Sequence, residues 1–235
     1  MKSLRQSLHK QDLLGLGIMV ILFVVFYFLF DEEILDDYWE TNVILILINI
    51  IMAVSLNLIN GLTGQFSIGH AGFMAVGAYT SAIITVKLGM DFPIALIVAT
   101  VSAAFLGFLI GMPTLRLNGD YLAIATLGLG EIIRIAILNI DYVGGASGFM
   151  GIPRLTTFPI AFWIMVFVVY FIKNFKNSAD GRACLAIREN EIAAETMGIN
   201  TTKYKVMAFT IGAGFAGTAG ALFSHYNYIA HPASF

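Results

Sequence analysis

Long apolar runs, separated by short polar stretches, make up most of this 235-residue chain. A helix that spans a membrane needs about 20 mostly apolar residues, with a range of roughly 17–25. Helices are expected, because an open sheet would leave backbone groups without hydrogen bonds in lipid. The apolar segments are seven in number: Leu13–Phe30, Val43–Leu58, Phe73–Val86, Phe92–Met112, Tyr121–Ile140, Phe158–Ile172 and Val206–Ala230. The pattern predicts an all-α polytopic membrane protein that forms one transmembrane domain over residues 1–235.

The composition of the chain points to the same class. Hydrophobic residues make up 58% of it and charged residues 12%, and the mean hydropathy is +0.84. Soluble domains carry about 25% charged residues, so half that share argues against a soluble fold. Cys184 is the single cysteine, and His9, His70, His225 and His231 lack the spacing of metal ligands. We expect neither a disulfide framework, nor a metal site, nor a cofactor.

The positions of lysine and arginine predict which side of the membrane each loop occupies. If residues 1–12 lie in the cytoplasm and every segment crosses, the cytoplasmic loops hold ten of these residues and the outer loops hold two. Cytoplasmic loops of membrane proteins carry such an excess. We therefore expect a multi-pass protein of the cell membrane with a cytoplasmic N-terminus. The charged stretch at 173–205 is then a cytoplasmic loop within the domain.

The segment at 59–72 is polar and rich in glycine but contains no charged residue. One interpretation is a discontinuous or re-entrant helix, which is tolerated at membrane depth where protein or water covers it, as along a substrate path. The other interpretation is an ordinary tight loop between two helices. On the first interpretation the polar side chains of the segment are candidates for the substrate pathway: Asn60, Thr63, Gln65, Ser67 and His70. His70 could also be a proton carrier or a hydrogen-bonded structural residue.

Glu131 and Arg134 lie three residues apart within the fifth apolar segment, so they share one face of a helix. An arginine at the bilayer centre costs about 2.5–3.5 kcal/mol on insertion scales, and it normally faces protein or water. The two residues are therefore either a polar patch on the pathway or an ion pair that locks helices together.

Small residues recur every four positions in the last apolar segment, at Gly212, Ala216 and Gly220. Small residues at this spacing let helix backbones approach closely. The pattern favours close packing of this segment, and a moving gate is the alternative.

The charged stretch holds six of the thirteen basic residues, and its centre resembles an amphipathic helix. Leu185, Ile192 and Met197 are expected to form one packing face of that helix. Asn190 can cap a new turn, and Gly198 can end it. This pattern suits a short helix that docks into a groove on another protein, or else a solvated surface helix.

Within this stretch, the run Glu191–Asn200 (EIAAETMGIN) resembles the EAA-type coupling loop of ABC importer permeases. The longer run Gly181–Phe209 (GRACLAIRENEIAAETMGINTTKYKVMAF) is similar to branched-chain amino acid importer permeases of the M type. Three further stretches agree with that family and follow its order along the chain: Asn60–Tyr79, Leu115–Arg134 and Gly144–Pro153. Together these stretches cover most of the chain after Leu58.

The resemblance implies a membrane permease subunit of an ATP-driven importer for branched-chain or similar amino acids. It implies a second, related permease, an extracytoplasmic solute-binding protein, and cytoplasmic ATP-binding subunits that hydrolyse ATP, so that this chain is not an enzyme. No nucleic acid partner is expected. The residues expected to couple the permease to the ATPase are Arg188, Glu189, Glu191, Ala193, Ala194 and Gly198.

Other functions and substrates stay open at the level of sequence. A secondary transporter could use Glu131 or His70 as a proton carrier, and a shortened permease could be a scaffold that transports nothing. Related permeases continue past the position that matches Phe235, so we expect a shortened permease or one that forms part of a pathway. Substrates of related permeases include urea and amides as well as amino acids.

Overall fold

The computed structural model describes residues 2–32, 36–115, 117 and 119–235. Helices dominate it: α1 Lys2–Asp31, α2 Asp37–Asn57, α3 His70–Ala82, α4 Phe92–Thr114, α5 Asp120–Leu138, α6 Phe158–Asn177, α7 Ala179–Glu189, α8 Glu191–Thr196 and α9 Thr201–Asn227. Two π-helical turns extend α2 and α3: η1 Leu58–Leu62 and η2 Ile83–Lys87. The other short elements are 3-10 turns and two strands: η3 Asp141–Val143, η4 Gly145–Ser147, β1 Phe149–Met150, β2 Ile229–Ala230 and η5 Pro232–Ser234. The all-α prediction is confirmed.

Among the described residues, five helices are long and apolar enough to cross a membrane. They are α2 with η1, α4, α5, α6 and α9. The apolar part of α1 covers Gly17–Phe30, and α3 has 13 residues, so both are shorter. A polytopic helical membrane protein is thus confirmed, whereas the expected count of seven spans is not.

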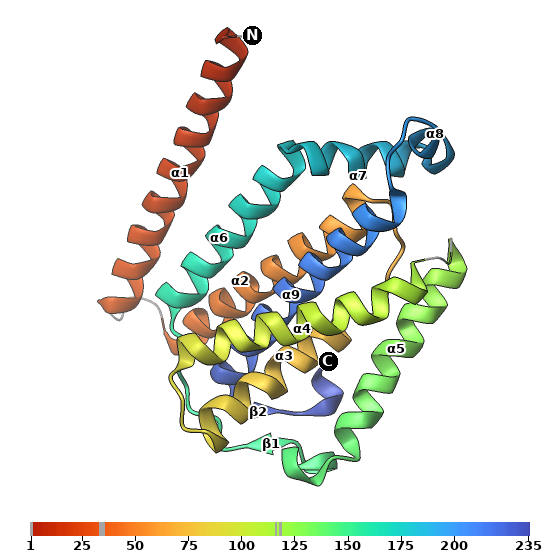
Figure 1. The fold of residues 1–235 in the computed structure, drawn as a ribbon. Helices are drawn as coiled ribbons and strands as arrows, with labels where there is room; N and C mark the ends of the chain where they lie inside the picture. Colours follow the sequence, from red (N-terminus) through yellow and green to blue (C-terminus); the bar gives the residue numbers. More distant parts are fainter. Residues whose placement is uncertain (1, 33–35, 116, 118) are drawn as a thin grey trace.

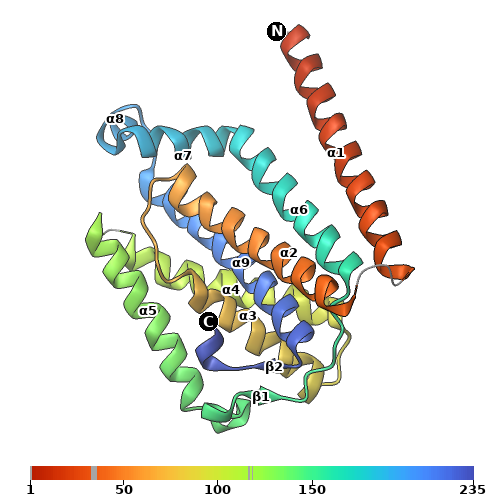
Figure 2. The same cartoon turned by 180° about the vertical axis from the view of Figure 1, so that it is seen from behind.

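Helix α9 forms the centre of the bundle, and α2, α3 and α4 pack around it (Figures 1 and 2). Small residues make this packing possible. A Cβ atom added at Gly220 would overlap the carbonyl oxygen of Met74 in α3, and one at Gly212 would lie 2.7 Å from the Ile59 side chain. The expectation of close packing along α9 is confirmed.

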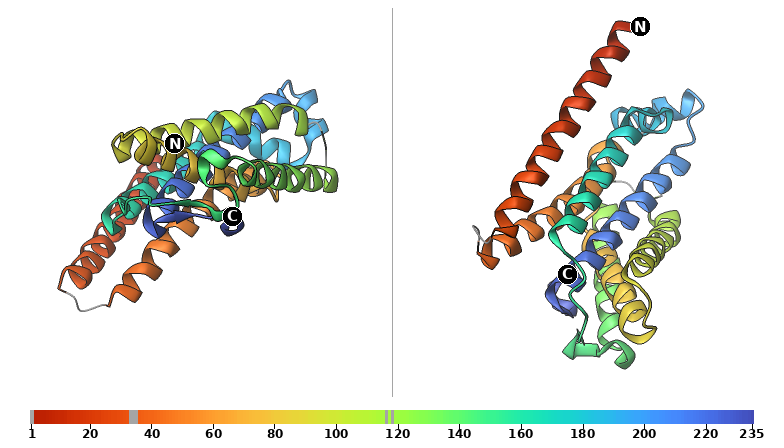
Figure 3. Two further views of the ribbon diagram at one scale, coloured as in Figure 1. Left: turned by 90° about the horizontal axis from the view of Figure 1, so that it is seen from below. Right: turned by 90° about the vertical axis from the view of Figure 1, so that its left-hand side faces the viewer.

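Helix α1 lies at the edge of the molecule beside α6 (Figure 3). Its contact with α6 is aromatic: the Phe23 ring lies 5.9 Å from Phe158, 5.2 Å from Phe162 and 5.3 Å from Trp163 between centroids. Helix α1 thus packs on the outside of the bundle, mainly against α6.

The helices alternate in direction, which gives the molecule two distinct ends (Figure 1). At one end, called here the α8 end, α2, α4 and α6 finish, α5 and α9 begin, and α7 and α8 lie across them. The opposite end, called here the β end, carries the antiparallel pair β1–β2, in which Phe149 lies opposite Ala230. The alternation that the sequence predicts is present in the fold.

The crossing that follows α2 is interrupted. After η1 the chain runs without helix over 63–69, turns back into the bundle, and only then begins α3 at His70 (Figure 2). The amide of Ile68 donates to Oγ1 of Thr126 in α5 at 3.1 Å, and a Cβ at Gly69 would overlap the Thr126 carbonyl. The segment therefore lies against the side of α5. The buried, extended course of the segment favours the interpretation of a discontinuous or re-entrant helix over that of a tight loop.

Candidate functional site

The charged stretch folds as two helices, α7 and α8, separated by Asn190. The Oγ of Ser178 accepts a hydrogen bond from the Gly181 amide at 3.1 Å and so caps α7. Asn190 has an extended backbone, and its Oδ1 accepts from the Ala193 amide at 3.0 Å. Such a side chain satisfies one of the amides that a helix N-terminus leaves free. The prediction that Asn190 caps a new turn is confirmed.

Gly198 ends α8, as the sequence predicts. Its φ is +83°, in the left-handed region that favours glycine. The Gly198 amide donates to the Glu195 carbonyl at 2.9 Å, and the Ile199 amide donates to the Ala194 carbonyl at 3.1 Å. These two bonds form a Schellman cap, which fixes where α8 stops.

The expectation of one packing face over Leu185, Ile192 and Met197 is wrong. The extended backbone of Asn190 interrupts the helical period between the first of these residues and the other two. Leu185 packs against the core, whereas Ile192 is 75% exposed and Met197 is 83% exposed. The two exposed side chains form an apolar surface at the tip of the molecule.

One side of α8 is fixed to α9. Ala194 is buried there. Glu191 Oε1 lies 2.5 Å from Nζ of Lys205 in α9, a lysine whose side chain is 8% exposed. Oγ1 of Thr201, also in α9, donates to Glu195 Oε1 at 2.7 Å. The opposite side of α8 is exposed and includes Ala193 and Gly198 beside Ile192 and Met197.

Arg188 joins the last turn of α7 to the interruption that follows α2, called here the break, which covers residues 60–70 from η1 to the start of α3. Its Nη1 donates to the Gly61 carbonyl at 2.9 Å, and its Nη2 donates to Glu189 Oε1 at 2.6 Å. Glu189 is otherwise exposed, with 71% of its side chain accessible. Of the six expected coupling residues, Glu189, Ala193 and Gly198 are exposed, and Glu191 and Ala194 contact other parts of this chain. Arg188 is exposed and also bonded to Gly61.

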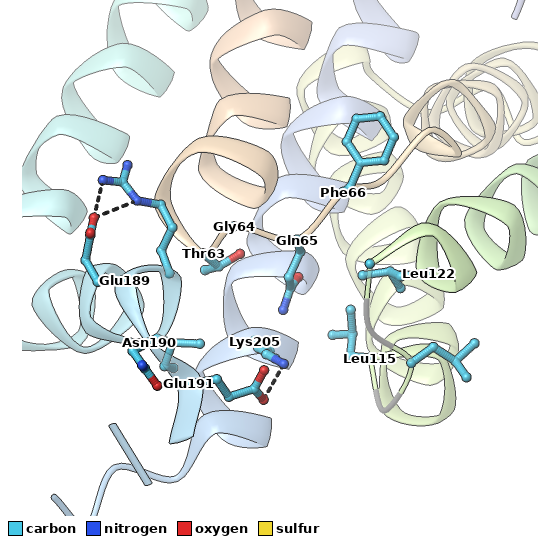
Figure 4. Close-up of a pocket in the computed structure, with 14 residues that line it drawn as sticks. Thr63, Gly64, Gln65, Phe66, Leu115, Leu122, Glu189, Asn190, Glu191 and Lys205 are labelled. Carbon is cyan, nitrogen blue, oxygen red and sulfur yellow. Dashed lines mark hydrogen bonds and ion pairs between the residues drawn. The ribbon is translucent and has the colours of Figure 1, made fainter. Parts of the chain in front are cut away.

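A cavity of about 280 Å³ lies between the break, the start of α5, the α7–α8 junction and α9 (Figure 4). Leu115, Leu122 and Ile187 supply apolar walls. Gln65 extends from the break toward the Lys205–Glu191 pair. The cavity therefore has one apolar side and one polar side, at the α8 end of the molecule.

The polar residues of the break are brought together, and most of them are buried. Asn60 holds the two ends of the break: its Oδ1 accepts from the Ser67 amide at 3.2 Å. Oγ1 of Thr63 donates to the Ile59 carbonyl at 2.6 Å. His70 Nε2 lies 2.8 Å from the Ser55 hydroxyl of α2. These bonds hold the non-helical backbone in place.

Several buried atoms of the break lack a hydrogen-bond partner among the described residues. They are both amide atoms of Gln65, the Ser67 hydroxyl oxygen and Nδ1 of His70. All three residues are at most 4% exposed. Buried polar groups in proteins are nearly always bonded, so these atoms mark a place where other groups or another conformation supply the bonds.

Glu131 and Arg134 pair with each other on α5, with Arg134 Nη2 at 2.5 Å from Glu131 Oε1. Both side chains are partly exposed, to a second cavity of about 390 Å³ that Gly69 and Pro232 also line. The pair joins two turns of one helix, so it does not lock two helices together. It lies apart from the Gln65 cavity, beside the other end of the break.

Sequence reasoning did not find the contacts of Gly61 and Lys205. Lys205 lies next to an apolar segment. Nothing in the sequence indicates that it pairs with Glu191, which is 14 residues earlier and on a different helix. Ile192 and Met197 could have been found, since each is a large apolar residue within a charged stretch. Within the described part of the chain, no cluster of His, Cys, Asp or Glu could hold a metal ion.

Comparison with known proteins assigns the chain to a family. Residues 38–235 match the family model described as the branched-chain amino acid transport system permease component. The chain belongs to this family. The matched region of this branched-chain permease family member includes the break, α7, α8 and α9. The resemblance inferred from the sequence is confirmed.

Curated relatives in the same family carry transport names. The high-affinity branched-chain amino acid transport system permease protein LivM of Escherichia coli (strain K12) is 38% identical over 226 residues, covering 81% of this chain and 53% of the relative. LivM of Salmonella typhimurium is 36% identical over 264 residues, covering 97% of this chain and 61% of the relative. LivH of the latter organism is 24% identical over 217 residues. The chain thus spans 53% to 61% of the length of these LivM relatives. No solved structure matches it.

Proposed function

We propose that this chain is a membrane permease subunit of an ATP-driven importer for branched-chain or similar amino acids. The observation that carries the proposal is the family match over residues 38–235, combined with α8, a capped helix whose exposed side is apolar. The names of the LivM and LivH relatives supply the substrate class. A second related permease and an extracytoplasmic solute-binding protein complete the assembly, and ATP hydrolysis takes place in separate subunits.

In this proposal, an ATP-binding subunit docks on the exposed side of α8. Ile192 and Met197 enter an apolar groove of that subunit, because large exposed apolar side chains lose unfavourable contact with water on binding. Ala193 and Gly198 allow close approach, and Glu189 lies at the rim. Ala194 and Glu191 hold α8 on the permease and so transmit force without touching the partner.

The proposal places the α8 end in the cytoplasm. The lysine and arginine residues of the loops gather on the segments that lie at this end, as the positive-inside rule expects. The β end then faces the solute-binding protein.

The substrate pathway is proposed to follow the break. Non-helical backbone at membrane depth is stable only where protein or water covers it. Asn60, Thr63, Gln65 and Ser67 provide uncharged polar groups there, and the Glu131–Arg134 pair provides charges beside the far end of the break. The unbonded buried atoms support this assignment, since a polar solute or the second permease could supply their partners.

The docking surface is tested by introducing charge at α8. Ile192→Asp and Met197→Asp should each reduce co-purification of the ATP-binding subunit by at least about tenfold, because central apolar anchors of an interface contribute about 2 kcal/mol or more. Lys176→Asp is the control, since Lys176 is exposed at the end of α6. Co-purification of the subunits is measured together with ATP-driven uptake into proteoliposomes.

Two results would contradict the proposed function. One is wild-type co-purification and uptake in both α8 variants. The other is uptake by the wild type that a pH gradient drives in the absence of ATP, which would favour a secondary transporter.

A further inference from the structure

Arg188 makes a direct side-chain hydrogen bond from the α7–α8 unit to the end of the broken span. Its guanidinium donates to the Gly61 carbonyl across 127 positions of sequence. The stem of the same side chain lies on the break: a Cβ at Gly64 would be 2.9 Å from Arg188 Cγ and 3.4 Å from its Cα. Gly64 also has a φ of +70°, so both its backbone and its surroundings require glycine.

The Gly61 carbonyl is a group that needs a partner. The end of a helix leaves its last carbonyls without intrahelical bonds and carries a partial negative charge. Gly61 lies in the last π-helical turn before the chain becomes extended. An arginine that donates to such a carbonyl forms a charge-assisted bond, and Glu189 orients the guanidinium from its other side.

Arg188 is also tied closely to α8. Only Glu189 and Asn190 separate it from the first residue of α8, and Asn190 is held by its cap on the Ala193 amide. Glu191, the first residue of α8, is paired with Lys205 of α9. A displacement of α8 therefore changes the position of Arg188 relative to the end of the broken span.

The part of the break that follows Gly61 can change conformation when Arg188 moves. Its extended part is held by the Asn60–Ser67 and Ile68–Thr126 bonds, while Gln65, Ser67 and His70 keep buried atoms without partners. A rearrangement of this segment loses few bonds and can gain several.

We propose that Arg188 is a positioning residue that couples the position of α8 to the conformation of the break. When α8 moves, the hydrogen bond from the guanidinium to the Gly61 carbonyl breaks or shortens. The polar side chains of the break then rearrange along the pathway. This inference rests on the proposed function, because it requires an ATP-binding subunit that moves α8.

The test compares two arginines of α7 in the complete assembly. Arg188→Gln removes the charge and the forked donor, whereas Arg182→Gln is the matched control, because Arg182 donates to the Asn177 carbonyl at the other end of α7. The readouts are amino acid uptake per ATP hydrolysed and the thiol labelling rate of a reporter, Ser67→Cys, with and without trapped nucleotide. Arg188→Lys is a second variant that keeps the charge and a hydrogen-bond donor group but loses the planar fork.

Arg188→Gln should keep the ATP-binding subunit bound and should lower uptake per ATP by about tenfold, the size expected for one lost hydrogen bond to a charged group. Nucleotide should no longer change the labelling rate of the reporter. Arg182→Gln should behave as the wild type, and Arg188→Lys should recover part of the coupling.

Three outcomes would overturn the inference. They are wild-type coupling in Arg188→Gln, equal losses in Arg188→Gln and Arg182→Gln, and loss of the ATP-binding subunit from Arg188→Gln, which would make Arg188 a docking residue. Absence of that subunit from the wild-type assembly would instead contradict the proposed function itself.

Discussion

At the scale of single residues, the position of α8 depends on a buried lysine. Lys205 is 6% exposed, and its ammonium group is paired with Glu191 at the start of α8. A buried charge is expensive unless it is paired, so this contact fixes α8 on α9 more firmly than a surface ion pair would. The local sequence around Lys205 gives no sign of this role.

Replacing Lys205 should therefore destabilise the protein more than replacing its neighbour. Lys205→Met leaves the Glu191 carboxylate without its partner and should cost about 1–3 kcal/mol. Lys203→Met, at an exposed position two residues earlier, is the control. Thermal unfolding of the purified protein measures the difference. Equal melting temperatures of the two variants would show that the Lys205–Glu191 pair does not stabilise the fold.

At the scale of elements, the interrupted crossing differs from the helices around it. Helices α2 and α9 are held by their own backbone bonds and by close packing, whereas residues 63–69 depend on side chains of η1, α5 and α7. Burial alternates along this segment: Gln65 and Ser67 are buried, and Phe66 and Ile68 are exposed. Alternation is typical of extended backbone, in which successive side chains point to opposite sides.

Thiol labelling should reproduce this alternation. Cysteines placed singly at Phe66 and Ile68 should react with a small, membrane-permeant thiol reagent at least about tenfold faster than cysteines at Gln65 and Ser67, because burial limits access of the reagent. The native Cys184 gives little background, since burial raises the pKa of its thiol to about 11. Labelling rates that do not alternate between neighbouring positions would contradict an extended segment packed against α5.

At the scale of the whole molecule, the two ends have different chemistry. The α8 end carries basic residues and the capped helix α8, and the β end carries the short strand pair and the glycine-rich turns around it. The family match covers both ends. The proposed function, in which an ATP-binding subunit docks at one end and a solute-binding protein at the other, requires such an asymmetry.

Labelling from opposite sides of the membrane tests the orientation. A cysteine at Met197, which is 83% exposed on α8, should react with an impermeant thiol reagent only from the cytoplasmic side. A cysteine at Tyr142, which is 58% exposed at the β end, should react only from outside. Comparison of intact cells with inside-out vesicles gives the result. Reversed labelling would place the N-terminus outside and would contradict docking of a cytoplasmic subunit on α8.

Much of this protein is determined by patterns that involve near neighbours. Apolar runs predict the helices, Asn190 and Gly198 predict where α8 begins and ends, and small residues predict the close packing of α9. Each of these depends on a few adjacent residues, so it can be predicted from sequence alone.

Only the tertiary structure decided how these elements act on one another. The bond from Arg188 to Gly61 and the pair of Lys205 with Glu191 join residues that share no local pattern. The apolar face expected over Leu185, Ile192 and Met197 was divided by a single extended residue, Asn190. Contacts between distant segments depend on the packing of the whole bundle, and for that reason the sequence predicts where α8 begins and ends but not the residues through which it reaches the broken span.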